Sequence, residues 1–398
     1  MIPRLKPDLS LTEIVSLFSI NRKTDIPEYE AAFSYLMNQS HAVFFPYGRT
    51  ALIFLLEALG INNKEVICPA YTCVVVPHAI VRSNNEPVFV DSCEVDFNMN
   101  WEQVEAATTE RTAAVVATSI FGYPVNLDAI KKYSARHPDV IILQDCAHSY
   151  AASWKGKSVQ SHGKAAFYGS NISKIMTSIF GGMVTTDDER LYRKLIELRS
   201  EKVSQPSLML DFARRLYLFS VWVGFNEKIY ALTNSLERSG LLDRLVRYYD
   251  ESKIDFPEDY LIGPTRTQAR IGKIQCAKYK KIVDDRILVA KFYNENLKFT
   301  GDLKLPPIID GATYSHYVPR TSQRPALLKH ALKNGVQLGQ LIEYCVPEMT
   351  AYKNRSGVRF DYPVSSKLAR ETINLPISLY GSTSKAEQVV TSLDSFDW

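Results

Sequence analysis

The segment VIILQDCAH, residues 140–148, carries the strongest indication of the fold. Its four leading apolar residues are typical of a strand that is buried on both faces, and the polar residues Gln144 and Asp145 follow them. Similar strand candidates lie at 42–45, 65–68, 87–90, 112–118, 165–168 and 181–186. Stretches with helical spacing alternate with them, at 51–59, 72–83, 101–107, 127–137 and 188–201. This alternation predicts an α/β fold in which helices cover both faces of a mostly parallel sheet.

The composition excludes several classes of protein. The chain has 398 residues, of which 46% are apolar, so it can fill a large core and is not globally disordered. The net charge is only +4, which argues against a nucleic-acid-binding protein. Six cysteines without a CxxC pair suggest free thiols in a reducing compartment and no metal site. The N-terminus lacks the apolar core of a signal peptide, so we expect a cytoplasmic protein.

The chain is expected to form two domains. A long amphipathic helix is predicted at 267–297, and short strands and helices alternate again from residue 304. We therefore predict a large domain at 1–260 and a smaller C-terminal α/β domain at 261–398.

An unusually apolar insert lies at 207–249. Five of its large residues are spaced as one face of a helix, namely Leu208, Phe212, Leu216, Phe219 and Val223. We interpret the insert as a helical hairpin packed on the body or on a partner subunit. One alternative is a peripheral contact with the inner face of the membrane, in which Arg214, Arg215 and Lys228 meet head groups. A lid over the substrate is the other.

Two turns offer residues for chemistry, because ligands of such folds gather beyond the carboxyl ends of the strands. Gly48, Arg49 and Thr50 lie between a strand and a helix, where unpaired N–H groups and the helix dipole suit a phosphate. The plain alternative there is a helix cap. Asp145 follows a strand directly, with His148 three residues later, and is well placed to meet a ligand. The alternative is a capping Asp followed by a structural His.

Two further features complete the set. Lys174 follows Ser170 and Ser173 in a segment of small residues, where a lysine tends to have a lowered pKa and can act as a nucleophile. The common alternative is a solvated surface charge. Tyr71 lies at a strand end, either flat against a planar ligand ring or in the core. Pyridoxal 5′-phosphate would use all four features, because it needs a phosphate cradle, a ring partner, a carboxylate at its pyridine nitrogen and a lysine at its aldehyde.

The chain resembles the DegT/StrS-type sugar aminotransferases, which are fold type I enzymes dependent on pyridoxal phosphate. The resemblance rests on the order and spacing of YGRTALIFLLEALGI (47–61), EVICPAYTCVVVPHAI (65–80), VIILQDCAHSYAASWKGK (140–157), SKIMTSIFGGMVTTDDE (173–189) and ETINLPISLYGSTSKAEQVV (371–390). It implies a seven-stranded sheet sandwiched by helices in the large domain. It also implies that Lys174 forms the Schiff base and shuttles a proton, and that Asp145 pairs with the pyridine nitrogen. His148 would then lie near the ring hydroxyl, and Gly48 in the phosphate loop.

This chain departs from the family pattern at four places. Arg49 stands where the family has a Thr, and we expect Thr50 to supply the hydroxyl instead. Cys73 stands where the family has the aromatic residue that stacks on the cofactor ring, and we expect Tyr71 to take that place. Gly169 stands where the family has a phosphate-binding Ser, and we expect Ser170 to replace it. The family's Asn-Tyr-Arg segment, which reaches the neighbouring subunit's phosphate site, falls on residues 261–263, which here are Leu-Ile-Gly. Arg49 is the expected compensation.

The resemblance implies transfer of an amino group from L-glutamate to a keto or aldehyde sugar, either nucleotide-linked or a higher sugar acid. The product would enter surface polysaccharide or lipopolysaccharide biosynthesis. A homodimer with the active site at the subunit interface is also implied. Candidates to face the substrate are His316, Tyr317, Arg320 and Tyr344. One alternative is a sugar dehydratase, whose subgroup has a His in place of the lysine, and the other is a non-catalytic, regulatory relative.

Overall fold

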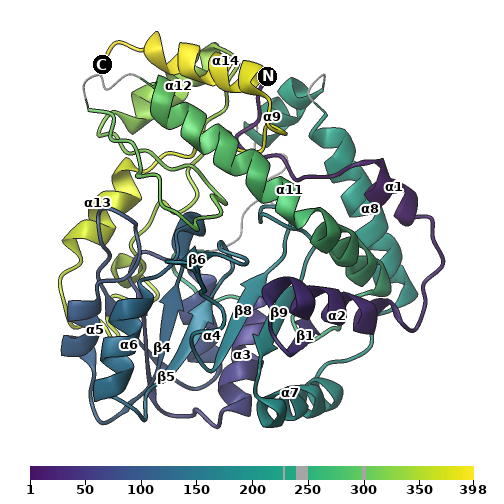
Figure 1. Ribbon diagram of the computed structural model, residues 1–398, viewed down its shortest axis with the longest axis vertical. Helices are drawn as coiled ribbons and strands as arrows, with labels where there is room; N and C mark the ends of the chain where they lie inside the picture. The colour runs from purple at the N-terminus through teal and green to yellow at the C-terminus, as the bar shows by residue number, and fades with distance from the viewer. Residues whose placement is uncertain (227–228, 239–249, 298–301) are drawn as a thin grey trace.

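A seven-stranded sheet forms the centre of the lower part of the molecule in Figure 1, a computed structural model that describes residues 1–226, 229–238, 250–297 and 302–398. Across the sheet the strands are β1 (His41–Phe45), β9 (Gly182–Thr186), β8 (Ala165–Gly169), β5 (Ile141–Asp145), β4 (Thr112–Thr118), β2 (Glu65–Pro69) and β3 (Glu86–Val90). β9 pairs antiparallel with β1 and β8, and the other neighbours are parallel. The predicted mostly parallel, seven-stranded sheet is therefore confirmed.

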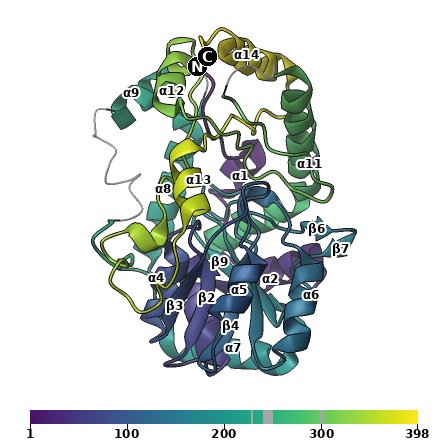
Figure 2. The ribbon, with the colours of Figure 1, turned by 90° about the vertical axis from the view of Figure 1, so that its left-hand side faces the viewer.

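Helices cover both faces of this sheet (Figure 2). One core contains α3 (Gly48–Ala58), α4 (Val75–Arg82) and α7 (Glu189–Lys202), and the other contains α2 (Asp25–Met37), α5 (Trp101–Ala107) and α6 (Leu127–Arg136). Side chains alternate between the two cores along each strand: Val43 and Phe45 face the first, and Phe44 faces the second. The continuous apolar runs of the sequence follow from this burial on both faces. The expected strands and helices up to residue 202 are all present, with ends that differ by three residues at most.

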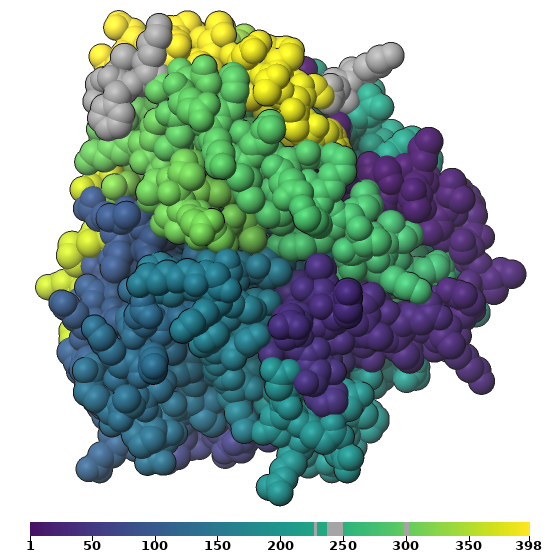
Figure 3. All heavy atoms as spheres, in the orientation of Figure 1, coloured from purple at the N-terminus to yellow at the C-terminus, as the bar shows by residue number. Residues whose placement is uncertain are grey.

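The C-terminal segments lie on top of the sheet part, as the green and yellow atoms of Figure 3 show. They contain the long α11 (Arg266–Asn296), α12 (Arg324–Lys333), α13 (Pro363–Glu371) and α14 (Thr383–Asp394). The short strands expected after residue 304 take the form of isolated bridges, such as those between Lys304 and Arg320 and between Tyr317 and Leu375. α11 packs on α2 below and on α14 above, so it belongs to both parts. A domain boundary at residue 260 stays a prediction.

The apolar insert contains α8 (Leu208–Gly224) and α9 (Tyr230–Arg238), while residues 239–249 and Lys228 lie outside the described residues. Two of the cations that the membrane interpretation assigned to head groups point inward instead. Arg214 pairs with Asp259, and Arg215 pairs with Asp211 at 2.8 Å. That part of the membrane interpretation is wrong, because these guanidinium groups find carboxylates within the protein. No helix among the described residues is long and apolar enough to cross a membrane.

A buried histidine joins the sheet part to the C-terminal part. His78 of α4 stacks on Tyr352, with ring centroids 5.8 Å apart, and neither ring nitrogen has a hydrogen-bond partner among the described residues. Burial, assisted by the charge of Arg49, lowers the pKa of His78 from 6.5 to about 4. The folded protein therefore keeps this imidazole neutral.

Acid should weaken this contact. Because the unfolded chain binds a proton at His78 more tightly than the folded one, the free energy of unfolding should fall by about 3 kcal/mol between pH 6.5 and pH 4 on account of this one group. In His78→Leu that contribution disappears, so urea unfolding at several pH values should give a shallower profile than the wild type. Comparison at pH 8 isolates the packing change. Parallel profiles over the acid range would show that His78 is not the titrating group.

Candidate active site

The turns after β1 and β8 touch at two glycines. A Cβ on Gly48 would lie 3.0 Å from the Cα of Gly169, and one on Gly182 would overlap the carbonyl of Tyr47. The phosphate-loop candidate, the end of β8 and the start of β9 therefore pack backbone to backbone. Lys174 lies beside this junction, since a Cβ on Gly169 would come within 3.8 Å of its Cε. A Cβ at position 169 would therefore lie in ordinary van der Waals contact with the lysine side chain.

Lys174 lies in the turn between β8 and β9, and its side chain is only partly exposed. Its backbone N–H donates to Asn171 O at 3.1 Å, which fixes the turn. Burial lowers the pKa of the Lys174 ammonium, and the nearby Cys73 and Asp145 oppose this shift. A lysine with a lowered pKa is more often neutral, as an amine nucleophile has to be.

Asp145 ends β5, in register with Thr118 of β4 and Phe167 of β8. Its Oδ1 accepts from Ala147 N–H at 3.0 Å, and its Oδ2 accepts from the Thr118 hydroxyl at 3.2 Å. No lysine, arginine or histidine of the described residues lies within ion-pair distance of this buried carboxyl. Burial raises the pKa of Asp145. A buried carboxylate without a paired cation suits a ligand that brings a positive charge.

His148 is held as a neutral imidazole. Its Nδ1 accepts the backbone N–H of Phe121 at 3.3 Å, which assigns the ring proton to Nε2. The ring stacks on Phe121, with centroids 6.0 Å apart and planes 17° apart, and His316 lies 5.4 Å away. Burial lowers the pKa of His148, with smaller contributions from Lys174 and His316. His148 thus offers an N–H donor close to the lysine.

Phe121 was not among the expected site residues. It adopts a left-handed conformation, with φ of 54°, which is uncommon for an aromatic residue. This turn after β4 aims its N–H at His148. A role that rests on a backbone N–H leaves no mark in the side-chain pattern, so it could not be recognised from the sequence.

Gly48, Arg49 and Thr50 form the first turn of α3, whose leading N–H groups have no acceptor within the helix. The Thr50 hydroxyl is fully buried and donates to Tyr260 O at 2.9 Å, so it is engaged inside the protein. Arg49 Nη1 donates to Asp255 O at 3.1 Å, and burial lowers the pKa of this guanidinium. The candidate phosphate site at the start of α3 therefore consists of backbone N–H groups with Arg49 beside them.

The remaining expected residues are bonded to protein groups. Ser170 Oγ lies 2.6 Å from Ser178 Oγ, and the Tyr71 hydroxyl lies 2.9 Å from Thr372 Oγ1 in the core. Ser173 Oγ donates to Asn171 Oδ1 at 2.6 Å and caps the lysine turn. The structure places Cys73, which is partly exposed, near Lys174 and Arg49.

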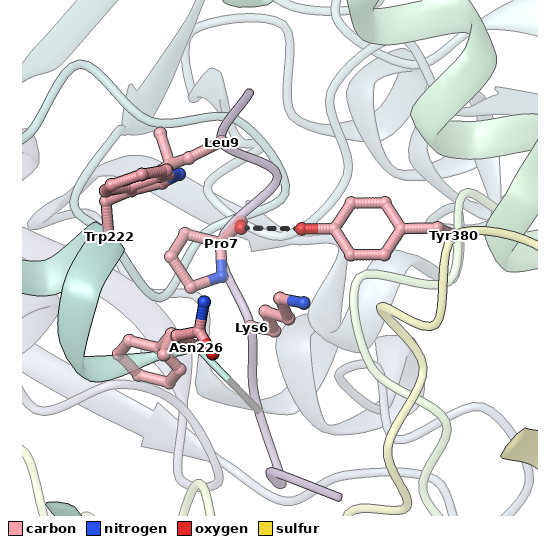
Figure 4. A pocket seen from close by; sticks show the side chains of 7 residues that line it. Lys6, Pro7, Leu9, Trp222, Asn226 and Tyr380 are labelled. Carbon is pink, nitrogen blue, oxygen red and sulfur yellow. Dashed lines mark hydrogen bonds between the residues drawn. The ribbon is translucent and has the colours of Figure 1, made fainter. Parts of the chain in front are cut away.

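Of the four candidates to face the substrate, His316 packs against His148, with ring centroids 5.4 Å apart, and its Nδ1 lies 3.1 Å from Ser315 Oγ. The Tyr317 hydroxyl donates to Asn294, Arg320 pairs with Glu94 at 3.1 Å, and the Tyr344 hydroxyl accepts Val74 N–H at 3.0 Å. A separate pocket of about 320 Å³ (Figure 4) contains none of the expected residues; Lys6, Pro7, Leu9, Trp222, Phe225, Asn226 and Tyr380 line it. The chemistry therefore concentrates at Lys174, Asp145 and His148.

This donor set fits pyridoxal 5′-phosphate. Lys174 supplies an amine, Asp145 a buried carboxylate without a cation, and His148 an N–H donor. The first turn of α3 and Arg49 supply anion-binding groups. These are the four kinds of group that the aldehyde, ring nitrogen, ring hydroxyl and phosphate require.

Comparisons with known proteins agree with the fold. An aminotransferase from Psychrobacter cryohalolentis has the same fold, with a TM-score of 0.77, 21% identity and coverage of 98% of this chain and 97% of that one. An uncharacterised protein of Methanocaldococcus jannaschii is 34% identical over 71% of this chain and 64% of its own length. GDP-perosamine synthase of Caulobacter vibrioides is 32% identical over 54% of this chain and 55% of its own. The matched region thus spans between about half and two thirds of the M. jannaschii protein and the GDP-perosamine synthase.

A family model matches residues 12–248 and 264–394, which is most of the chain and includes every expected site residue. The chain belongs to the DegT/DnrJ/EryC1/StrS aminotransferase family.

Proposed function

We propose that this protein is a pyridoxal phosphate-dependent sugar aminotransferase. The observation that carries the proposal is that the amine of Lys174, in the turn after β8, and the buried carboxyl of Asp145, at the end of β5, lie close enough for each to act on the pKa of the other. Family membership supports the same reaction class. When bound, pyridoxal 5′-phosphate supplies an aldehyde that takes up the amino group and a ring that takes up electrons.

Each residue has a separate task in this proposal. Lys174 Nζ would hold the cofactor at its aldehyde carbon, whose oxygen would leave as water, and when free it would carry the proton removed from the amino donor. Asp145 keeps a proton on the ring nitrogen. His148 donates from Nε2 to the ring hydroxyl, because its Nδ1 is occupied by Phe121. The first turn of α3 and Arg49 bind the phosphate, and the turn residues Ser170 and Ser173 hold the lysine segment in place.

L-Glutamate is the proposed amino donor, and the proposed acceptor is a keto or aldehyde sugar, nucleotide-linked or a higher sugar acid. The similarity to GDP-perosamine synthase supports a nucleotide-linked acceptor. Surface polysaccharide or lipopolysaccharide assembly would use the product. We further propose a cytoplasmic homodimer in which residues 1–260 carry most of the cofactor site.

Two other functions make different use of the same fold. A sugar dehydratase is disfavoured, because Lys174 stands where that subgroup has a His. A non-catalytic regulator would explain why the hydroxyls of Thr50 and Ser170 are bonded within the protein. It would not explain why Asp145 is buried without an ion-pair partner among the described residues.

A half-reaction separates these functions. Purified protein loaded with pyridoxal 5′-phosphate and mixed with L-glutamate should convert to the pyridoxamine form, seen as loss of its near-visible absorbance. A panel of keto sugars should then restore that absorbance, and the sugar that does so fastest identifies the acceptor. Protein that gains no absorbance band with the cofactor, or keeps the band unchanged with every amino donor, would contradict transamination.

A further inference from the structure

Arg214 links the apolar insert to the two turns of the candidate active site. The Cζ of its guanidinium lies 4.4 Å from the ring centroid of Phe180, which belongs to the lysine turn at residues 170–181. The guanidinium also pairs with Asp259 and lies 3.4 Å from the hydroxyl of Tyr47, directly before the candidate phosphate site. Because the Arg214 side chain is only 16% exposed, these contacts form largely out of water.

The Tyr47 hydroxyl lies between a carboxylate and a cation. It donates to Asp259 Oδ1 at 2.6 Å and accepts from Arg214 Nη2. Burial and the bond to Asp259 raise the pKa of Tyr47, so the hydroxyl keeps its proton. Tyr47 is also the N-cap residue of α3, and its carbonyl accepts Ala51 N–H at 2.9 Å. Since the ring is rigid, holding its hydroxyl restrains the backbone from which the first N–H groups of α3 follow.

Phe180 gives Arg214 a hold on the lysine turn. A cation over the face of an aromatic ring is attracted by the negative charge density of that face. The Phe180 ring also lies 6.0 Å from the Tyr47 ring. Two residues later, a Cβ on Gly182 would overlap the Tyr47 carbonyl, so the end of the lysine turn packs directly on the residue that begins α3. Arg214 therefore contacts both sides of this junction.

We propose that Arg214 is a positioning residue through which the insert strengthens the binding of pyridoxal 5′-phosphate. The inference rests on the proposed function, because it concerns the cofactor of that reaction. The pair with Asp259 offsets the charge of Arg214, so its effect runs through Tyr47 and Phe180 and not through a bond to the phosphate. By holding the start of α3 and the lysine turn in one arrangement, Arg214 reduces the ordering that binding would otherwise require.

Titration of the cofactor-free protein with pyridoxal 5′-phosphate, followed by absorbance, tests this inference. Arg214→Gln should raise the dissociation constant at least about tenfold. Arg215→Gln is the matched control, because this neighbouring arginine of α8 bonds to the Leu17 carbonyl and Asn21 instead of the two turns. It should lower the urea concentration of unfolding but keep the wild-type affinity for the cofactor. The same rise in dissociation constant in both variants would overturn the inference, since the effect would then follow the stability of α8.

Tyr47→Phe provides a second test in case Arg214→Gln does not fold. It removes a single hydroxyl and leaves the pair between Arg214 and Asp259 in place, and it should raise the dissociation constant about threefold or more. Wild-type affinity in both Arg214→Gln and Tyr47→Phe would overturn this inference alone. A wild type that does not bind the cofactor would overturn the proposed function together with it.

Discussion

Replacing Lys174 by alanine is expected to lower the transamination rate by about 10⁴-fold or more. The variant loses the amine that would hold the cofactor and the base that would move the proton. Burial lowers the pKa of this lysine, and no other lysine among the described residues shares its surroundings with Asp145, so no neighbour can take over. Turnover with L-glutamate and the absorbance band of the lysine-bound cofactor should vanish together.

Lys280→Ala is the control for this result. Lys280 is a surface residue of α11 that pairs with Asp284 at 2.7 Å, and its loss should change neither the rate nor the absorbance. Normal turnover by Lys174→Ala would disprove its catalytic role. A lost band combined with a normal melting temperature would exclude misfolding as the cause.

The sequence predicted the sheet well, because a strand buried on both faces must be apolar throughout. It predicted less about which neighbour replaces a missing residue. Side chains at adjacent positions on a helix point about 100° apart. The Thr50 hydroxyl therefore donates to Tyr260 O, while the Arg49 guanidinium, in the first turn of α3, donates to Asp255 O. Tyr71 shows the same limit at a strand end, where its hydroxyl reaches Thr372, more than 300 residues away in the chain.

Helical spacing also left the orientation of α8 open. A stripe of large apolar residues has the same spacing whether it faces the core or a partner. Only the tertiary structure brings Asp259 to Arg214, and the Leu17 carbonyl and Asn21 to Arg215, and these contacts turn the charged side inward. The sequence therefore identified the stripe, and the folded chain decided which way it points.

Replacing Asp145 by asparagine should lower the transamination rate by about 10²- to 10⁴-fold while the cofactor stays bound. The amide has the same shape, and its oxygen still accepts from Ala147 N–H, but it cannot keep a proton on the ring nitrogen. Single-turnover measurements with L-glutamate, followed by absorbance, report this step directly. Asp284→Asn, which alters an exposed pair on α11, is the matched control and should react at the wild-type rate.

Stability separates this chemical role from a structural one. Burial raises the pKa of Asp145, so the folded cofactor-free protein binds its proton more tightly than the unfolded chain does. The contribution of this group to stability is therefore lost as the pH rises from its ordinary value of 3.8 through the raised one. Asparagine does not titrate, so the variant does not lose stability in this way as the pH rises. At pH 7 the cofactor-free variant should therefore unfold at the same urea concentration as the wild type or at a higher one. Reduced stability together with reduced rate would show that Asp145 mainly holds the ends of β4 and β5 together, whereas a lower rate at undiminished stability would assign it to the ring nitrogen.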